Sequence, residues 1–259
     1  MSIVRRVLVG LAGLVIGLAV SAPAPAHAQP KSKPSGEIRV SAASSLTDVL
    51  PVIARAFEKR YPGTKITFNF GGSSTLVSQV IGGAPVDVIA TASELTMRSA
   101  VDAGAVDRPM IFARNTMAVA MPADNPARIL RLSDLARPGV LVGVCDVAVP
   151  CGAAARDVLR KARVTLTPVT RELDVRGVLG KVMSGELDAG IVYVTDVRAA
   201  GRKVTSIPIP ATANVTTTYP IATVRGTANP VTSQAFVDYV RSSPSAQGIL
   251  HAYGFAKPR

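Results

Sequence analysis

The chain has 259 residues, with 29 lysines and arginines against 17 aspartates and glutamates, a formal net charge of +12. Its apolar content of 48% is enough for one large domain or two modest ones. Because the basic residues are scattered and aromatic side chains for base stacking are few, we predict a solvated basic surface and no nucleic-acid partner. Such a surface still draws anions toward the protein.

The first 28 residues differ from the rest. A basic start, "MSIVRR", precedes the apolar run "VLVGLAGLVIGLAV" and the small-residue pattern at 26–28. The run is shorter than the ~20 residues of a membrane span, so we predict a cleavable signal peptide over 1–28 and export to the periplasm. An uncleaved anchor is the alternative. Residues 29–36 are polar and rich in Pro and Ser, which predicts a flexible tail.

Short β-rich runs then alternate with segments of helical period. This alternation predicts an α/β fold with mainly parallel sheets flanked by helices. In 46–60 the apolar residues fall on one helical face, and Pro51 inside that segment predicts a kink or a late start. The predicted strands are 38–42, 65–70, 86–90, 117–121, 140–144, 189–194, 204–209 and 221–224.

Several predicted helices begin with small or polar residues. Ser45 to Asp48 has the spacing of a capping box, "FGGSSTL" follows a strand, "VPCG" opens a helix, and another opens at Asp174. Helix starts leave unpaired N–H groups, and in a parallel α/β sheet these lie where ligands bind. Several starts facing one crevice would suit an oxyanion, with serine hydroxyls as extra neutral donors. Serines that only cap are the alternative.

Three other features have structural interpretations. Cys145 and Cys151 in "CDVAVPC" fit neither a zinc site nor a redox pair, which leaves a disulfide in an exported protein or two free buried thiols. Asp87 is interpreted as a structural carboxylate, because a carboxylate beside an anion site would oppose binding. Arg176 is interpreted as a solvated helix residue, with electrostatic assistance to a bound anion as the alternative.

The chain resembles the periplasmic molybdate-binding proteins of ABC importers over about Ile38 to Phe255. The resemblance is carried by "AASSLTDVLPVIARAFEK", "FNFGGSSTLVSQVIGGAPVDVIATAS", "ELDVRGVLGKVMSGELDAGIVYVTDV", "YPIATV" and "AFVDYV…AYGF". It implies the two-lobed type II architecture of periplasmic binding proteins. Lobe 1 would comprise 37–118 and 219–259, and lobe 2 would comprise 119–218, with crossings near 117–122 and 219–224.

The resemblance also implies which residues bind the anion. Ser45 and Ser73 would supply hydroxyl and backbone donors, Cys151 and Val175 their backbone N–H groups, and Tyr193 its phenol. Molybdate, or tungstate, would be the ligand, with no cofactor and no direct metal ligand, and a membrane ABC permease would be the partner of a monomer. The family commonly has "GDPxxVPAG" where this chain has "CDVAVPCG", so a disulfide that distorted this loop would put the third contact in doubt.

Other functions stay open at this point. The same fold could bind sulfate, another oxyanion or a small organic acid, and a ligand-loaded protein could also serve a sensor. A secreted serine hydrolase would use Ser45 or Ser73 as nucleophile and need His251 as base, since His251 is the one histidine after the predicted signal. No G-x-S-x-G motif accompanies it, so we do not expect an enzyme.

Overall fold

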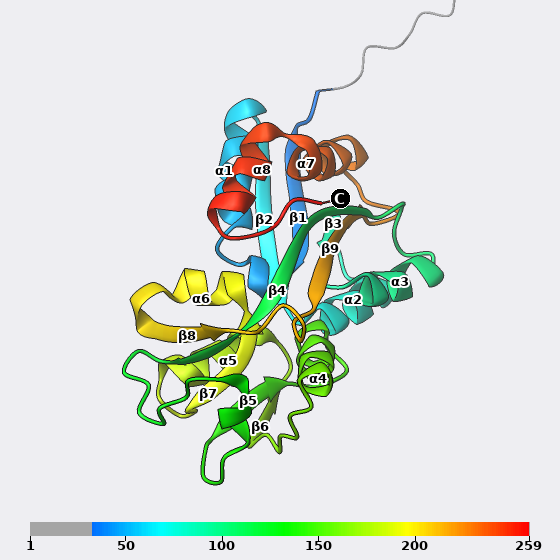
Figure 1. The fold of residues 1–259 in the computed structure, drawn as a ribbon. Helices are drawn as coiled ribbons and strands as arrows, with labels where there is room; N and C mark the ends of the chain where they lie inside the picture. The colour runs from blue at the N-terminus through cyan, green and yellow to red at the C-terminus, as the bar shows by residue number, and fades with distance from the viewer. Residues whose placement is uncertain (1–32, 259) are drawn as a thin grey trace, which may run out of the picture. The chain divides into compact units, whose positions relative to one another are not determined.

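The computed structural model describes residues 33–258, so the predicted signal peptide and residues 29–32 of the tail lie outside it. Within that range strands and helices alternate as predicted (Figure 1). The strands are β1 (Gly36–Ala43), β2 (Thr64–Gly71), β3 (Val88–Ala90), β4 (Met110–Pro122), β5 (Val142–Cys145), β6 (Thr170–Glu172), β7 (Ala189–Tyr193), β8 (Val204–Pro208) and β9 (Thr216–Thr223). The helices are α1 (Leu50–Arg60), α2 (Ser73–Ile81), α3 (Glu94–Asp102), α4 (Pro150–Ala162), α5 (Val175–Met183), α6 (Val194–Ala200), α7 (Pro230–Ser242) and α8 (Pro244–Ala252), with 3₁₀ turns η1 (Ser44–Leu46), η2 (Leu132–Ala136) and η3 (Gly201–Lys203).

The strands form one sheet in the order β2-β1-β3-β9-β4-β7-β5-β6, with β8 also paired to β4. The outer pairs β1–β2, β1–β3, β5–β6 and β5–β7 are parallel, whereas β4 and β9 pair antiparallel with their neighbours. Residues 110–116 of β4 pair with β9, and residues 117–122 pair with β7 and β8. One strand therefore continues from the first group of parallel strands into the second, as Figure 1 shows.

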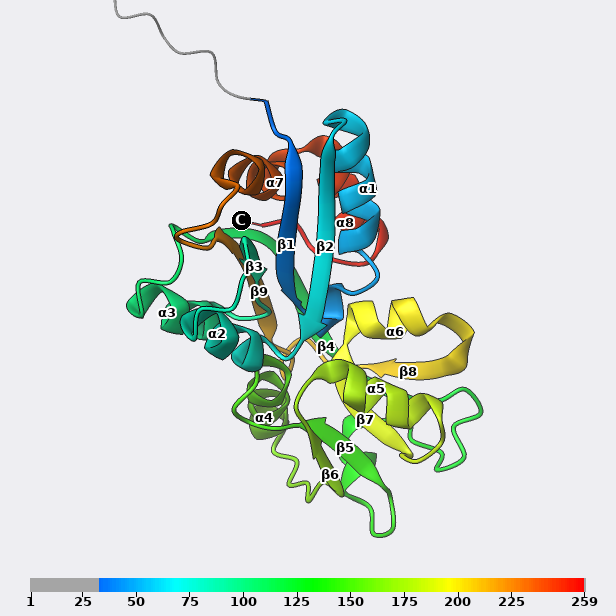
Figure 2. The same ribbon diagram turned by 180° about the vertical axis from the view of Figure 1, so that it is seen from behind.

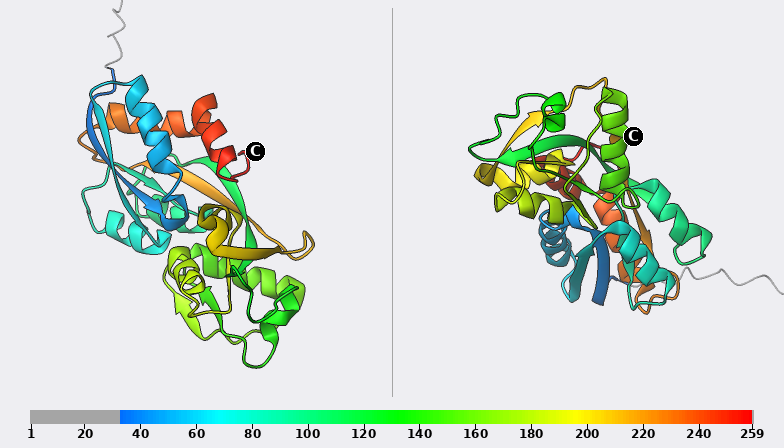
Figure 3. Two further views of the ribbon diagram at one scale, coloured as in Figure 1. Left: turned by 90° about the vertical axis from the view of Figure 1, so that its left-hand side faces the viewer. Right: turned by 90° about the horizontal axis from the view of Figure 1, so that it is seen from below.

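Helices cover both faces of the first group. Val88 and Ala90 pack in the main core with α1 and α7, whereas Ile89 packs with residues of α2 and α3. Successive side chains of a strand point to opposite faces, so the two helix groups lie on opposite sides of the sheet (Figure 2). The last two helices of the chain, α7 and α8, pack on each other and against α1 (Figure 3). The predicted α/β class is confirmed.

The first helix differs from its prediction. Residues 44–46 form a 3₁₀ turn, and α1 starts only at Leu50 with Pro51 in its first turn. A proline fits there because its missing N–H would be unpaired in any case. The predicted capping box at Ser45–Asp48 is wrong, since neither helix start has a side-chain cap and the Thr47 hydroxyl donates to the carbonyl of Ser44.

Three strands also differ from prediction. Strand β6 was not predicted, because "TRE" is short and polar. Strands β4 and β9 begin earlier than expected, at Met110 and Thr216. The extra residues pair with each other across the centre of the sheet, and they include polar residues that break the hydrophobic pattern. Among residues 33–258, no helix has both the length and the apolar character that a membrane crossing requires.

Candidate functional site

A small cavity lies where the chain leaves several strands, with about 220 Å³ of empty space that includes open solvent. All five residues predicted to contact an anion line it: Ser45, Ser73, Cys151, Val175 and Tyr193. Two sets of residues face each other across it. We call the set from the ends of β1, β2 and β3 the first wall: Ala43, Ser44, Ser45, Gly71, Gly72, Ser73 and Ala92. We call the set from the loops and helix starts after β5, β6 and β7 the second wall: Val149, Pro150, Cys151, Leu173, Asp174, Val175 and Tyr193.

The first wall presents two buried serine hydroxyls. Ser73 is the first residue of α2, and its Oγ accepts a hydrogen bond from the Ala92 N–H at 3.1 Å. Because an amide can only donate, the Ser73 hydroxyl keeps its own proton for a further acceptor. Ser45 lies in η1, and its Oγ is 3.0 Å from the hydroxyl of Tyr219. Both oxygens therefore have partners inside the protein while their residues face the cavity.

The second wall presents backbone amides at two helix starts. Asp174 caps α5, and its Oδ1 accepts from the N–H groups of Arg176 at 2.7 Å and Gly177 at 3.2 Å. This cap satisfies the second and third amides of the helix and leaves the amide of Val175, the first residue, beside the cavity. The Asp174 carboxylate is engaged by these donors, which reduces its repulsion of a bound anion.

Cys151 lies in the first turn of α4, after Pro150. The structure joins it to Cys145 in a disulfide, with the two Cα atoms 5.7 Å apart. The turn is tight: a Cβ at position 152 would lie 1.8 Å from the Asp146 carbonyl oxygen, so only glycine fits. The disulfide thus closes the loop that leads into α4 without displacing Cys151 from the cavity.

Tyr193 ends β7, and its hydroxyl is buried without a hydrogen-bond partner among the described residues. Burial raises the pKa of this phenol well above its usual value, so it is a proton donor at neutral pH. Tyr219 and Thr217 are near enough to influence that pKa, yet neither forms a hydrogen bond with it. A buried polar group without a partner is costly, so this hydroxyl is a donor that the described residues leave available at the cavity.

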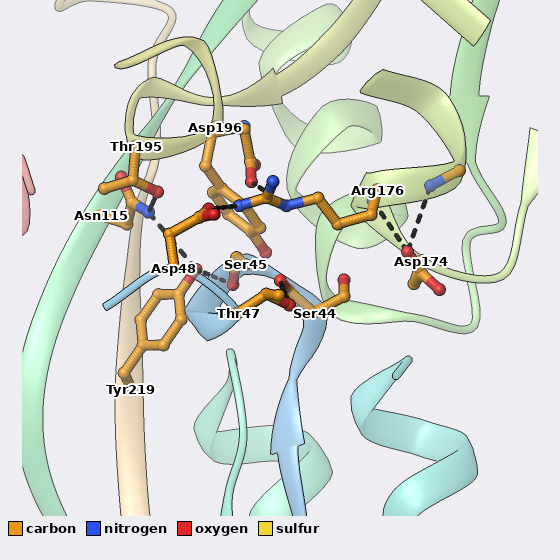
Figure 4. A network of polar contacts seen from close by, with 12 residues as sticks. Ser44, Ser45, Thr47, Asp48, Asn115, Asp174, Arg176, Thr195, Asp196 and Tyr219 are labelled. Atoms are coloured by element: carbon orange, nitrogen blue, oxygen red, sulfur yellow. Dashed lines mark hydrogen bonds and ion pairs between the residues drawn. The ribbon is translucent and has the colours of Figure 1, made fainter. Parts of the chain in front are cut away.

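Arg176 links two carboxylates beside the cavity, so its interpretation as a solvated residue is wrong (Figure 4). One guanidinium nitrogen pairs with Asp48, and Nε lies 3.3 Å from Oδ1 of Asp196 in an ionic contact without hydrogen-bond geometry. From the first turn of α5, the Arg176 side chain reaches Asp48, just after η1, and Asp196 of α6. Sequence reasoning missed this link because Asp48 is 128 residues away in the chain.

Asp196 is fully buried, and its Oδ2 accepts from the Tyr193 N–H at 3.1 Å. Burial raises its pKa to about 7, against the opposing effect of Arg176 and the Tyr193 N–H, while the nearby carboxylates of Asp48 and Asp174 add to the rise. The carboxyl thus anchors the end of β7, where Tyr193 enters the cavity.

The two walls also touch directly. The Ser74 hydroxyl donates to the Ala148 carbonyl at 2.8 Å. A Cβ at Gly72 would lie 2.4 Å from the Leu173 carbonyl oxygen. Only glycine therefore permits this approach, a role that the sequence analysis did not assign to Gly72.

The remaining candidate residues lie elsewhere. Asp87 accepts from the Arg39 N–H at 2.7 Å and from the Thr227 hydroxyl, which agrees with a structural carboxylate. His251 is exposed on α8 and does not line the cavity. No group of His, Cys, Asp and Glu suited to a metal ion occurs within residues 33–258.

A larger hollow, with about 1080 Å³ of empty space that includes open solvent, flanks α4. Its lining includes Arg156, Arg160 and Arg171, but Asp157 pairs with the first two. It contains none of the five predicted residues and no orphaned buried polar atom. The small cavity is therefore the better candidate.

The chain matches the family model of the bacterial extracellular solute-binding proteins over residues 38–256. It is 40% identical over 236 residues to the molybdate-binding protein ModA of Mycobacterium tuberculosis strain H37Rv, which covers 88% of this chain and 90% of the relative. Two solved structures share the fold at 20% identity. The periplasmic molybdate-binding protein of Azotobacter vinelandii has a TM-score of 0.74 and covers 86% of this chain and 100% of its own. The sulfate-binding protein SubI of Mycobacterium tuberculosis H37Rv has a TM-score of 0.73, and the match covers 86% of this chain and 87% of SubI.

Proposed function

Because this chain belongs to the bacterial extracellular solute-binding proteins, we propose that it captures molybdate in the cavity between its two walls. The observation that carries the proposal is the Tyr193 hydroxyl, buried without a partner beside serine hydroxyls whose oxygens are already engaged. The cavity presents several hydrogen-bond donors, which suits a fully ionised dianion. The 40% identity to a molybdate-binding relative favours molybdate over other dianions.

Five donor residues would surround the anion. Ser45 and Ser73 would act through their hydroxyls and amides, Cys151 and Val175 through amides at helix starts, and Tyr193 through its phenol. These donors are neutral, so affinity comes from many charge-assisted hydrogen bonds, each worth about 1.5–3 kcal/mol. Oxygen atoms of molybdate would accept them all, with no protein ligand to the metal and no cofactor.

Two lobes would close on the anion, lobe 1 from 37–118 and 219–259 and lobe 2 from 119–218. The change of partner along β4, from β9 to β7 and β8 at 116–117, supports one crossing there. The pairing of β9 with β4 from Thr216 onward supports a return crossing at the start of β9, slightly before the boundary expected from the sequence. Donors from both lobes would couple binding to closure.

Delivery to an ABC permease would follow capture, with the protein acting as a monomer in the periplasm. The membership in an extracellular family and the apolar segment at the N-terminus support this location. Transport and sensing would use the same binding step. A serine hydrolase is not supported, because His251 lies outside the cavity that contains Ser45 and Ser73.

Sulfate is the second candidate ligand, since a sulfate-binding protein shares the fold. Both dianions accept hydrogen bonds from the same donors, so cavity size must separate them, and tungstate should bind much as molybdate does. Isothermal titration calorimetry with molybdate, tungstate, sulfate and phosphate tests this. Molybdate and tungstate are expected to bind at least 100-fold more tightly than sulfate. Equal binding of sulfate would overturn the molybdate assignment.

The same titration tests the site. Tyr193→Phe should weaken molybdate binding about 10- to 100-fold, the cost of one charge-assisted hydrogen bond. The control is Tyr239→Phe, a buried tyrosine of α7 that does not line the cavity. If both variants bind as the wild type does, the cavity is not the binding site.

A further inference from the structure

A chain of hydrogen bonds leads from the centre of the sheet to the cavity. It joins Asn115 on β4, Tyr219 on β9 and Ser45 in the first wall (Figure 4). All three residues are buried, with at most 4% of their surface exposed. Neither Asn115 nor Tyr219 lines the cavity. The Tyr219 ring packs against Tyr193, and its hydroxyl is hydrogen-bonded to Ser45, so Ser45 is the cavity residue that this hydrogen-bond chain reaches.

Asn115 determines which atoms donate and which accept along this series of hydrogen bonds. Its Oδ1 accepts from the Thr116 N–H at 3.0 Å, which identifies the other amide atom as the NH₂ group. That nitrogen lies 2.7 Å from the Thr195 hydroxyl and 3.4 Å from the Tyr219 hydroxyl. An amide nitrogen only donates, so the oxygen of Tyr219 is an acceptor at this contact.

Tyr219 then has one proton to give. Among the described residues its hydroxyl forms hydrogen bonds with Asn115 Nδ2 and Ser45 Oγ, and of these two partners only Ser45 can accept. Burial raises the pKa of this phenol, so the proton is present at neutral pH. Ser45 Oγ therefore accepts from Tyr219 at 3.0 Å, and the single Ser45 proton points away from this bond.

We propose that Asn115 and Tyr219 are positioning residues that fix the Ser45 hydroxyl as a donor toward the bound dianion. This inference rests on the proposed function. Ser73 reaches the same state by a different route, since the Ala92 N–H occupies its oxygen. Both serines of the first wall would thus present protons only, and a ligand that must donate a proton to either would meet another donor.

A double-mutant cycle of Tyr219→Phe and Ser45→Ala tests the inference. Tyr219→Phe frees the Ser45 hydroxyl to rotate, and we expect molybdate affinity to fall about tenfold by calorimetry. In the Ser45→Ala background the same change should alter affinity less than twofold, because nothing remains to be oriented. Equal losses in both backgrounds would overturn the inference, because a merely structural role of Tyr219 would not depend on Ser45. Tyr239→Phe is the matched control and should leave affinity unchanged.

Asn115→Asp should reverse the donor and acceptor roles along this series of hydrogen bonds. An aspartate accepts the Tyr219 proton, Tyr219 then accepts from Ser45, and the serine proton is turned away from the anion. We expect a larger loss than with Tyr219→Phe, about 100-fold, and a loss at least fivefold smaller in the Ser45→Ala background, where only the added charge acts. Wild-type affinity in Asn115→Asp, or an undiminished loss in the Ser45→Ala background, would overturn the inference. Circular dichroism checks that each variant folds, and the Tyr219→Phe cycle stands if Asn115→Asp does not.

The two proposals fail in different ways. Wild-type protein that does not bind molybdate would overturn the proposed function. Wild-type binding with additive effects of Tyr219→Phe and Ser45→Ala would overturn only the role of Asn115 and Tyr219.

Discussion

The two walls of the cavity hold their donors by different means. On the first wall the donors include serine hydroxyls, and neutral hydrogen bonds from Ala92 N–H and Tyr219 orient them. On the second wall two of the three predicted contacts are backbone amides, held by the Cys145–Cys151 disulfide and by the cap at Asp174. Arg176 and Asp196 add an ion pair behind that wall.

The comparison shows where each wall is vulnerable. A neutral hydrogen bond between two buried groups is indifferent to pH and to redox state. A disulfide responds to reductant, and a buried carboxylate responds to pH and to loss of its cation. Changes of solution conditions should therefore act on the second wall, whereas the first wall should respond to substitution alone.

The largest effect is expected from Arg176→Met. It leaves Asp196 buried without its cation, which costs about 3 kcal/mol of unfolding free energy at pH 8. The loss should shrink at pH 6, where the carboxyl can bind a proton instead. Urea denaturation measures both values. Arg225→Met is the control, since its partner Asp107 has 57% of its side-chain surface exposed, and the loss there should stay below about 1 kcal/mol. Equal losses of unfolding free energy in the two variants would show that the Arg176–Asp196 ion pair does not specifically stabilise the second wall.

An intermediate effect is expected from the pair of changes Cys145→Ser and Cys151→Ser. The disulfide closes a short loop, with a sequence separation of 6, and its loss should lower the free energy of unfolding by about 2 kcal/mol. Molybdate affinity should also fall several-fold, because the Cys151 amide is then held less firmly. Thermal unfolding and calorimetry, each with and without reductant, measure this. Reductant should weaken the wild type and leave the double variant unchanged; a variant that still responds to reductant would contradict the account.

The smallest effect over a single pH unit is a pH dependence from Asp196. Its pKa is raised to about 7 in the fold, against ~3.9 for an unfolded aspartate, so between these values the folded protein holds a proton that the unfolded chain releases. This stabilisation is complete below about pH 4 and is lost as the pH rises through 7, by at most about 1.4 kcal/mol per pH unit. Asp196→Asn keeps the shape and should remove this slope. Parallel curves of stability against pH for wild type and variant would show that Asp196 does not titrate here.

Local signals predicted much of the fold. Helix starts depend on neighbouring residues, so Asp174 was recognised as the start of α5 and Pro51 as the cause of a late α1. Most strands whose ends reach the cavity are apolar enough to be predicted, whereas the short, polar β6 is not. The resemblance supplied the five candidate residues, and the structure brings all five to one cavity, although their contact with an anion stays a prediction.

The residues that support the site could not be found in this way. Tyr219 contacts Ser45 across 174 positions, and Asn115 contacts Thr195 across 80. Inside a strand, Asn115 interrupts an apolar pattern and looks like a solvent-facing position. Only the pairing of β4 with β9 reveals that it is buried and hydrogen-bonded.

Gly72 lies against the Leu173 carbonyl, where the two walls meet, and we expect this close approach to govern how long a captured ion stays. Any side chain at residue 72 would act as a wedge, and dissociation would speed up even with every donor intact. We expect residence time to depend on the smallest residue in the molecule.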